Sequence, residues 1–300
     1  MFFYFVQIML WFFRFLALFP FAFLHFVGAL AGLVAYAFSP RYRRQLRENM
    51  AIAGIPAKLR FAVAMEAGKQ ALETIKIWMR PQAEAIAHIR EVRGQDCLAA
   101  ALKESQASGR GILYLTPHLG CFEMIGQYLS ATVGDFTALY REPRYKILQT
   151  LILAGRTRGR FHLAAADTGG VRALIRALKR GEAVGMLPDQ TPKKGLGVWL
   201  DFFGRPAYTM TLAARLSEVA GVTLLVWVER LPRGGGYRMH FSKPVSPLEG
   251  DTIARAAQIN REIENLIRCC PSQYLWGYNR YKGKKSPSEE IDEDNSTKMQ

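Results

Sequence analysis

The chain has 300 residues, of which 50% are hydrophobic, and its formal net charge is +15 with the histidines neutral. This length suffices for one substantial core or one domain with appendages, and the apolar content excludes a disordered chain. The excess of basic residues favours anionic partners, such as phospholipid headgroups, phosphorylated sugars, acidic carrier proteins or nucleic acid.

Residues 1–38 are apolar or small almost throughout, with Arg14 as their one basic residue and no acidic residue. At about 1.5 Å per residue, a helix of this length is longer than one bilayer crossing requires. We therefore expect a membrane anchor, either one tilted helix with an interfacial extension or two short helices broken near Pro20. A cleaved signal peptide is the alternative, because residues 29–31 (Ala-Leu-Ala) resemble a cleavage site. The missing basic start and the length of the run argue against it.

Residues 39–93 are expected to form a helical, membrane-proximal segment, with helices over 43–53 and 56–79 and Pro81 as a breaker. By the positive-inside rule, four arginines at its start keep the downstream domain on the cytoplasmic side: Arg41, Arg43, Arg44 and Arg47. Other cations alternate with apolar residues, which is typical of a solvated helix face or of a basic collar against anionic headgroups: Arg60, Lys69, Lys76 and Arg80.

Residues 94–282 alternate between strand-like and helix-like runs. This pattern predicts an α/β fold with a mixed, mostly parallel sheet flanked by helices, and a hairpin turn at 233–236. Residues 283–300 are rich in Lys, Ser, Pro, Glu and Asp, so we expect a disordered tail. The expected strands are 111–115, 136–140, 161–165, 183–187, 198–203, 222–228 and 237–241, and the expected helices are 97–107, 122–131, 147–157, 171–179, 212–219 and 252–269.

Chemistry is expected where the apolar run 111–115 ends, because α/β proteins tend to place their sites at strand ends. His118 and Glu123 follow this run, with four small or apolar residues between them. On one helix the two side chains would diverge by about 140°, so they meet only if His118 lies in the turn and Glu123 in the first helical turn. Glu123 would then bond one imidazole nitrogen, fix the tautomer and leave the other nitrogen as a general base. A purely structural histidine in the turn is the alternative.

Cys121 offers a rival mechanism, as an acylated nucleophile with His118 as its base, although a buried cysteine more often packs as a small hydrophobe. Zinc binding by His118, Cys121 and Glu123 is a further alternative, but the spacing is unlike that of known sites and no fourth ligand is evident. The cysteines have no metal-framework spacing, and we interpret all of them as reduced thiols of a cytoplasmic domain: Cys97, Cys121, Cys269 and Cys270.

Basic residues gather in the middle of the chain. Arg141 follows an expected strand, and Arg156, Arg158 and Arg160 stand at alternate positions where an expected helix ends. They can form a phosphate clamp, or they can be cations beside the last helical carbonyls. Asp189 also follows an expected strand, where it can orient a substrate hydroxyl, pair with an arginine or cap a turn. Residues 202–207 can form a wall of an acyl-chain pocket or a tight loop.

Several segments occur in a fixed order: His118 with Glu123, Tyr140-Arg141, Gly155-Arg156-Thr157-Arg158, Leu187-Pro188-Asp189-Gln190, Phe203-Gly204-Arg205-Pro206, and Gln273-Tyr274-Leu275-Trp276 with Arg280-Tyr281-Lys282. This ordered set, over roughly residues 1–285, resembles the late acyltransferases of lipid A biosynthesis, the lauroyl and myristoyl transferases. They belong to the glycerolipid acyltransferase superfamily, whose signature is His-(four residues)-Asp. Glu in place of Asp, as at Glu123, is typical of the lipid A branch.

The resemblance implies a bacterial inner-membrane enzyme with a cytoplasmic active site. Such an enzyme moves a fatty acyl group from acyl carrier protein to a hydroxyl of a 3-hydroxyacyl chain on a phosphorylated, Kdo-bearing lipid A precursor. The implied catalytic pair is His118 and Glu123, and the implied substrate-binding residues are Arg156, Arg158, Asp189 and Arg141. The resemblance implies no metal, no dissociable cofactor and no nucleic acid, and it adds membrane phospholipids as a partner.

Two other functions stay open at this point. The first is an acyltransferase for another membrane acceptor, such as glycerol phosphate or a phosphoinositol mannoside. The second is a non-catalytic, membrane-anchored protein that binds polyanions, which would explain the charge and the anchor. That function does not explain why an apolar strand leads to His118 and Glu123, or why the segments occur in this order.

Overall fold

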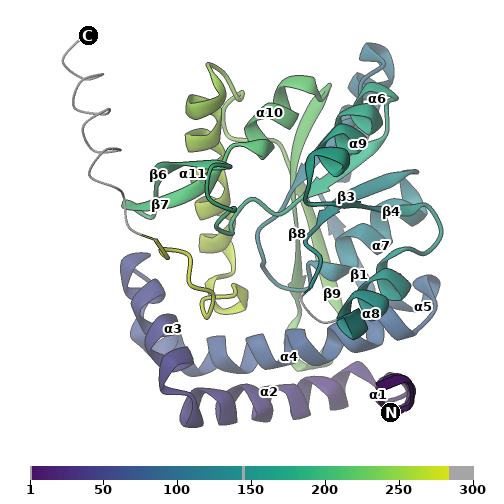
Figure 1. The fold of residues 1–300 in the computed structure, drawn as a ribbon, viewed down its shortest axis with the longest axis vertical. Helices are drawn as coiled ribbons and strands as arrows, with labels where there is room; N and C mark the ends of the chain where they lie inside the picture. Colours follow the sequence, from purple (N-terminus) through teal and green to yellow (C-terminus); the bar gives the residue numbers. More distant parts are fainter. Residues whose placement is uncertain (1, 144–145, 284–300) are drawn as a thin grey trace.

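A computed structural model describes residues 2–143 and 146–283 (Figure 1). In this part of the chain, one large sheet has the strand order β1-β9-β8-β2-β5-β3-β4, and all neighbours are parallel except β8 and β9. The prediction of an α/β fold with a mostly parallel sheet is therefore confirmed. The strands are β1 (Ile89–Arg93), β2 (Ile112–Leu115), β3 (Phe136–Tyr140), β4 (Phe161–Ala165), β5 (Ala183–Met186), β8 (Val222–Arg230) and β9 (Tyr237–Ser242).

Helices cover both faces of this sheet, and strand β2 shows why. Its side chains alternate between the faces. Ile112 and Tyr114 join the buried cluster of α6 and α7, whereas Leu113 and Leu115 join that of α9, α10 and α11. A strand buried on both faces has a continuous apolar sequence, as here. The helices of the domain are α5 (Gln82–Ile86), α6 (Gln95–Ser108), α7 (Glu123–Thr132), α8 (Lys146–Arg156), α9 (Thr168–Lys179), α10 (Leu212–Val219) and α11 (Thr252–Cys269), with 3₁₀ turns η2 (Pro232–Gly234) and η3 (Pro271–Gln273).

The six helices and the seven strands predicted for the core are confirmed, with small shifts at their ends, but two further strands, β1 and β7 (Arg205–Met210), were not predicted. Residues 89–93 were expected to close the helical segment and instead form β1, which pairs with β9. The expected strand at 198–203 forms as β6 (Gly197–Phe202), but it lies outside the main sheet and pairs with β7 in a separate hairpin. Positive φ at Phe203 and Gly204 makes the tight turn, so these residues form a turn of the hairpin. The predicted tail, 283–300, lies outside the described residues except for Gly283.

The N-terminal stretch forms two helices separated at Pro20, α1 (Phe2–Leu16) and α2 (Phe21–Phe38), which is the second of the expected arrangements. Among the described residues, only α2 is long and apolar enough to be a candidate membrane-crossing helix, by length and composition. The expected helical segment follows as α3 (Pro40–Ile52), η1 (Ala57–Leu59) and α4 (Arg60–Met79). Helices α2 and α4 lie side by side along one end of the domain (Figure 1).

Glycines bring α2 and α4 into backbone contact. A Cβ atom added at Gly32 would lie 1.9 Å from the carbonyl oxygen of Ala64, and one added at Gly68 would lie 1.9 Å from the carbonyl oxygen of Gly28. Small residues permit such close approach of two helices. The contact therefore fixes α2 against the folded domain.

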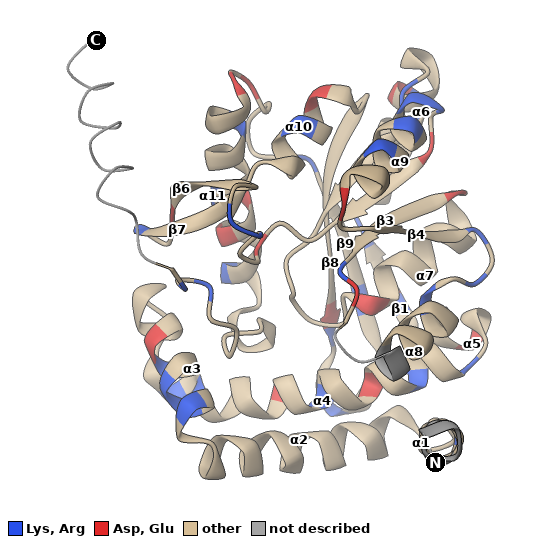
Figure 2. Cartoon of the chain, in the orientation of Figure 1, with Lys and Arg blue, Asp and Glu red and all other residues tan. Residues whose placement is uncertain are grey.

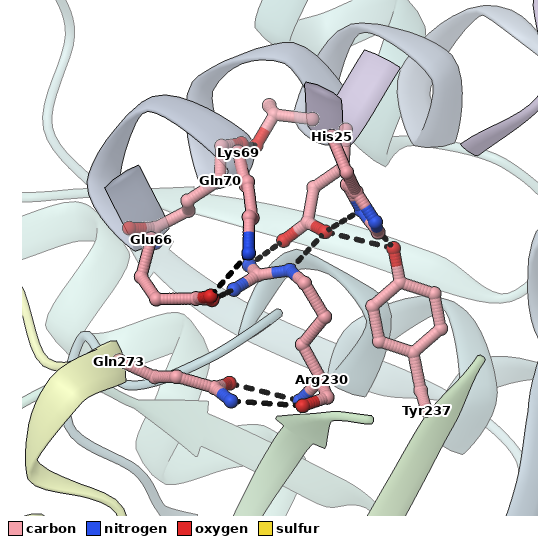
Figure 3. Close-up of polar contacts among 9 residues, drawn as sticks. His25, Glu66, Lys69, Gln70, Arg230, Tyr237 and Gln273 are labelled. Carbon is pink, nitrogen blue, oxygen red and sulfur yellow. Dashed lines mark hydrogen bonds and ion pairs between the residues drawn. The ribbon is translucent and has the colours of Figure 1, made fainter. Parts of the chain in front are cut away.

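A buried ionic cluster ties the same two helices to the sheet (Figure 3). Glu73 of α4 accepts hydrogen bonds from Arg230 Nε (2.9 Å) and Tyr237 Oη (2.7 Å), and its Oε2 lies 2.9 Å from Nε2 of His25 on α2. Glu66 binds the same guanidinium. Burial disfavours the ionised form of Glu73, but Arg230 outweighs this effect and holds the pKa of the carboxyl well below its usual value.

We predict that Gly32→Leu separates α2 from α4, because the new side chain must displace the backbone of α4. Overpacking of this kind costs about 1–3 kcal/mol of folding free energy. Thermal unfolding of the purified protein in detergent measures it. Ala35→Leu, on the exposed side of the same helix, is the control and should leave the unfolding temperature unchanged. Equal stability of both variants would show that the contact contributes nothing.

Candidate active site

The turn that carries His118 is held on both sides. After β2, the backbone N–H of Gly120 donates to the carbonyl of Gln273 (3.0 Å), and that of Cys121 donates to the carbonyl of Val228 (2.9 Å). The His118 carbonyl accepts from Leu275 N–H (3.1 Å). Gly120 has φ +57°, and a Cβ there would lie 1.8 Å from the Val228 oxygen, so only glycine fits. The backbone around the imidazole is therefore rigidly placed.

The carboxylate that contacts the imidazole is Asp189. Its Oδ1 lies 2.8 Å from Nδ1 of His118, and its Oδ2 accepts the backbone N–H of the same residue at 3.0 Å. Strands β2 and β5 are parallel neighbours, so the segments after them meet at one edge of the sheet. Burial raises the pKa of Asp189, but its contacts with His118 outweigh burial and the pKa lies below its usual value. Asp189 is therefore ionised at neutral pH.

This pairing defines the state of the imidazole. An ionised carboxylate only accepts hydrogen bonds, so Nδ1 of neutral His118 carries the proton and donates it to Asp189. Nε2 then has a free lone pair, and it lies 3.1 Å from the side-chain amide nitrogen of Gln190, which donates to it. The ring also contacts Phe122 edge-to-face at 4.9 Å. With its side chain 18% exposed, His118 presents a basic nitrogen at the edge of the sheet.

The prediction that Glu123 hydrogen-bonds to His118 is wrong, because the two ring nitrogens contact Asp189 and Gln190. Glu123 does lie in the first turn of α7, as expected, but its side chain is buried and binds Arg156, through Nε at 2.9 Å and through Nη2, and the indole N–H of Trp78 at 3.0 Å. The start of α7 places this carboxylate against Trp78 of α4 and Arg156 of α8. Burial disfavours the charge, yet Arg156 lowers the pKa of Glu123 below its usual value.

The predicted clamp of three arginines is not formed. Arg156 binds Glu123, Arg158 donates to the carbonyls of Ile77 and Arg80 at the end of α4, and Arg160 pairs with Asp135 at 2.7 Å. Arg158 thus caps α4, whereas the alternative considered for it was a place beside the last carbonyls of its own helix; burial lowers the pKa of its guanidinium. The physical reason is that α8 ends among carboxylates and carbonyls of other elements.

Two hollows adjoin this region. A narrow cavity of about 50 Å³ lies beside Glu123 and Arg156 and has mostly apolar walls, including Leu139. A larger groove of about 400 Å³ also includes Leu139, with Arg141 and Lys193 on its wall. The structure therefore places Arg141 on an apolar groove at the same edge of the sheet, separate from Arg156 and Arg158.

The alternatives for Cys121 are tested by its surroundings. The thiol is buried, and burial together with the nearby Glu73 carboxylate raises its pKa well above the usual value. Cys121 belongs to the apolar cluster under α7, so it packs as a hydrophobe and does not form a ready thiolate. Within the described residues, no three or more His, Cys, Asp or Glu side chains are grouped so that they could hold a metal ion.

Sequence reasoning missed three residues of this site. Gln190 was noted in a motif but given no role, although it follows Asp189 directly. Trp78 lies on α4, far from His118 in sequence, and nothing local marks it. Gln273 was also noted only in a motif. Its side chain accepts from the Arg230 N–H and donates to the Arg230 carbonyl, both at 2.8 Å, and its own carbonyl accepts from Gly120, so it links the turn of His118 to the end of β8.

Comparison with known proteins decides the family. A family model described as bacterial lipid A biosynthesis acyltransferase matches residues 1–283. The chain belongs to this family. It is 27% identical to the lipid A biosynthesis palmitoleoyltransferase of Escherichia coli (strain K12) over 271 residues, which cover 88% of this chain and 86% of that protein. It is 29% identical to the lauroyltransferase of the same organism over 218 residues, covering 72% and 69%.

A third relative, the lipid A biosynthesis myristoyltransferase of Escherichia coli (strain K12), is 22% identical over 237 residues, covering 74% of this chain and 72% of that protein. The resemblance inferred from the ordered segments is thus confirmed. The acyltransferase acts in lipid A biosynthesis, and the His118–Asp189 and Glu123–Arg156 pairs are its candidate active site.

We predict that Arg156→Met destabilises the acyltransferase by about 3–5 kcal/mol, because it leaves the buried Glu123 carboxylate without a cation. Chemical unfolding in detergent gives the difference. The control, Arg160→Met, removes one partner of an exposed ion pair and should cost about 0–1 kcal/mol. Similar losses in both variants would contradict a buried, uncompensated charge as the cause.

Acid should destabilise the acyltransferase in part by protonating Glu123 in the Glu123–Arg156 pair. Because the pKa of Glu123 is lowered, the pair stabilises the fold fully above the ordinary pKa of 4.5 and loses this contribution as the pH falls through the lowered value. The free energy of unfolding, measured from neutral pH downward, should therefore fall more steeply below pH 4.5 in the wild type than in Glu123→Gln. Parallel curves would show that Glu123 keeps its ordinary pKa in the folded protein.

Proposed function

We propose that this acyltransferase moves a fatty acyl group from acyl carrier protein to a hydroxyl of a 3-hydroxyacyl chain on a phosphorylated, Kdo-bearing lipid A precursor. The observation that carries the proposal is the His118–Asp189 pair, whose geometry suits a general base that activates a substrate hydroxyl. Membership of the lipid A family supplies the acceptor class. The site residues need neither a metal nor a dissociable cofactor for this step.

The proposed reaction uses Nε2 of His118 first as a base and then as an acid. Nε2 of His118 takes the proton of the acceptor hydroxyl as its oxygen attacks the thioester carbonyl and the new C–O bond forms. The C–S bond then breaks, and the proton passes from His118 to the leaving thiolate of the carrier protein's prosthetic arm. Asp189 positions the ring and stabilises the imidazolium between these steps. The acceptor hydroxyl would take the place that the Gln190 amide holds at Nε2.

The Glu123–Arg156 pair lies at the start of the helix that follows His118. We assign Glu123 the task of holding Arg156 in the wall of the cavity beside the turn, which revises the direct His118–Glu123 dyad. Nε and Nη2 of Arg156 bind Glu123, so Nη1 is the donor that we assign to the oxyanion of the tetrahedral intermediate. Burial makes such a donor stronger than it would be in water.

The chemistry of the two proposed substrates agrees with the charge of the chain and with its apolar groove. Acyl carrier protein is acidic and the lipid A precursor is phosphorylated, so both suit a chain with net charge +15. The apolar groove with Arg141 and Lys193 suits an amphiphile that carries an anionic group. The proposed location is the bacterial inner membrane, with the catalytic domain in the cytoplasm and membrane phospholipids as a further partner.

Mass spectrometry of lipid A from cells with and without this gene tests the acceptor. We expect the lipid A of the intact strain to be heavier by one acyl group. Identical lipid A, together with acyl transfer to glycerol phosphate by the purified protein, would show that the acceptor is a different membrane lipid.

We predict that His118→Ala and Asp189→Asn lower the kcat of acyl transfer by roughly 10²–10⁴, because the first removes the base and the second loses the hydrogen-bond acceptor that fixes its tautomer. KM should change little, because Asp189, which the resemblance implied to bind substrate, contacts His118 and acts here on the base. Kinetics with purified acyl carrier protein thioesters measure both constants, and unfolding temperatures check the fold.

Cys121→Ala is the matched control for direct transfer and should keep near-normal kcat. Loss of transfer in this variant, together with an acyl-cysteine adduct trapped in the wild type, would show that the acyl group passes through the thiol. Near-normal kcat in His118→Ala would show that the imidazole is not the base.

A further inference from the structure

The outer face of α2 is a continuous apolar surface. Phe26, Leu30, Val34 and Phe38 are spaced by four residues, so they lie along one side of the helix, and their exposed fractions are 49–82%. Neighbouring α1 adds exposed aromatic side chains, with Trp11 70% exposed. Exposed apolar surface of this extent, rimmed by charge, marks an interaction site. No Lys, Arg, Asp or Glu side chain interrupts α2 (Figure 2), and its one titratable imidazole, that of His25, is buried on the inner face.

The inner face of α2 is bound to α4 along most of its length. Near the N-terminal end His25 lies on Glu73; in the middle Gly28 meets Gly68; and near the C-terminal end the rings of Tyr36 and Phe61 are 5.5 Å apart. A helix held at every turn by a neighbour cannot leave that neighbour without breaking these contacts.

This attachment decides how α2 meets a membrane. If α2 crossed the bilayer, α4 would enter with it and would carry Glu66, Lys69, Glu73 and Lys76 into the hydrocarbon. Charged groups at that depth cost several kcal/mol each, and α4 is in turn packed on the folded domain. A helix with an apolar outer face, whose inner face is attached to a charged helix, lies instead in the plane of the membrane–water interface.

A basic groove stands at the end of this surface. Where α2 ends and α3 begins, Arg43, Arg44, Arg47 and Arg60 line a groove of about 560 Å³. Figure 2 shows the cations of α3 gathered beside the C-terminal end of α2. Arg43 is used structurally, since its Nη1 donates to the Ala37 carbonyl at 2.8 Å. The groove's carboxylate, Glu48, lies 3.9 Å from the Arg44 guanidinium, and both are largely exposed.

We propose that α2 lies in the plane of one leaflet, with its outer face in the acyl chains, and that the arginine groove of α3 binds the phosphate of an anionic phospholipid in the same leaflet. The cations of α3 follow the apolar stripe of α2 directly in the chain, so they lie beside the leaflet that holds the stripe. Arginine suits a phosphate because its planar fork donates two parallel hydrogen bonds. Pro40, the first residue of α3, lines the groove, so a lipid bound there lies next to the C-terminal end of α2. The proposal is independent of the acyl-transfer assignment.

Thermal unfolding of the full chain in neutral detergent tests the groove. Short-chain phosphatidylglycerol should raise the unfolding temperature, because a ligand that binds only the folded state stabilises it, whereas phosphatidylcholine should not. In Arg44→Gln/Arg47→Gln, the phosphatidylglycerol concentration for half-maximal protection should rise about 10- to 30-fold, at roughly 3- to 5-fold per lost cation.

The matched control is Arg172→Gln/Arg176→Gln, which removes two exposed cations from α9 and should keep the wild-type response. Equal weakening in both double variants would show a response to net charge alone and overturn the groove. Equal protection by inorganic phosphate would overturn the lipid as its occupant. Unchanged protection by phosphatidylglycerol in Arg44→Gln/Arg47→Gln would also overturn the proposed lipid site.

Thiol labelling tests the orientation. In a background with Cys97, Cys269 and Cys270 replaced by Ser, one variant carries a cysteine in a hydrophilic N-terminal tag and a second carries Glu48→Cys. With α2 in the plane, a membrane-impermeant maleimide should label both from the cytoplasmic side, in inside-out vesicles and not in spheroplasts. Labelling from opposite sides would show that the N-terminal segment crosses the membrane and would overturn the in-plane placement. Neither assay uses acyl transfer, so its outcome is separate from that of the proposed activity.

Discussion

The buried contact between Glu73 and Arg230 is the constraint on which the rest of the structure depends. Two opposite charges with almost no exposure are stable only together, since loss of either leaves the other uncompensated at a cost of about 3–5 kcal/mol. Arg230 ends β8, and its backbone is fixed by Gln273, whose carbonyl in turn accepts from Gly120 in the turn of His118. The ion pair therefore fixes α4 and the imidazole relative to the same strand end.

The strand order, more than the spacing along the chain, chooses the partner of the imidazole. Glu123 is close to His118 in sequence, but its place in the first turn of α7 directs it to Trp78 and Arg156. Asp189 is distant in sequence, yet it follows β5, the neighbour of β2, and parallel strands bring their carboxyl ends together. Each carboxylate is stabilised as an anion by a different cationic or polarised partner, which separates their tasks.

This difference also marks what could be predicted from sequence. Apolar periodicity located the core helices and β2, β3, β4, β5, β6, β8 and β9, because those elements bury side chains in local patterns. β1 is short and carries three charged residues, so only its long-range pairing with β9 makes it a strand. β7 begins at Arg205-Pro206 and is a strand because it forms a hairpin with the preceding β6. The roles of Asp189, Gln190 and Trp78 depend on which elements are neighbours in space, and no local pattern contains that.

Helix α4 joins the membrane problem to the chemical one. On one side it holds α2 through the glycine contact and His25; on the other it holds Glu123 through Trp78 and Arg230 through Glu73. One helix is about 10–12 Å thick, so with the proposed α2 at the level of the headgroups, the thickness of α4 separates the lipid from the sheet. A lipid acceptor would then reach His118 with its polar part raised from the leaflet and its other chains still in it. The anchor and the base are thus placed by one helix, which explains why its inward face carries buried charges that an ordinary amphipathic helix would avoid.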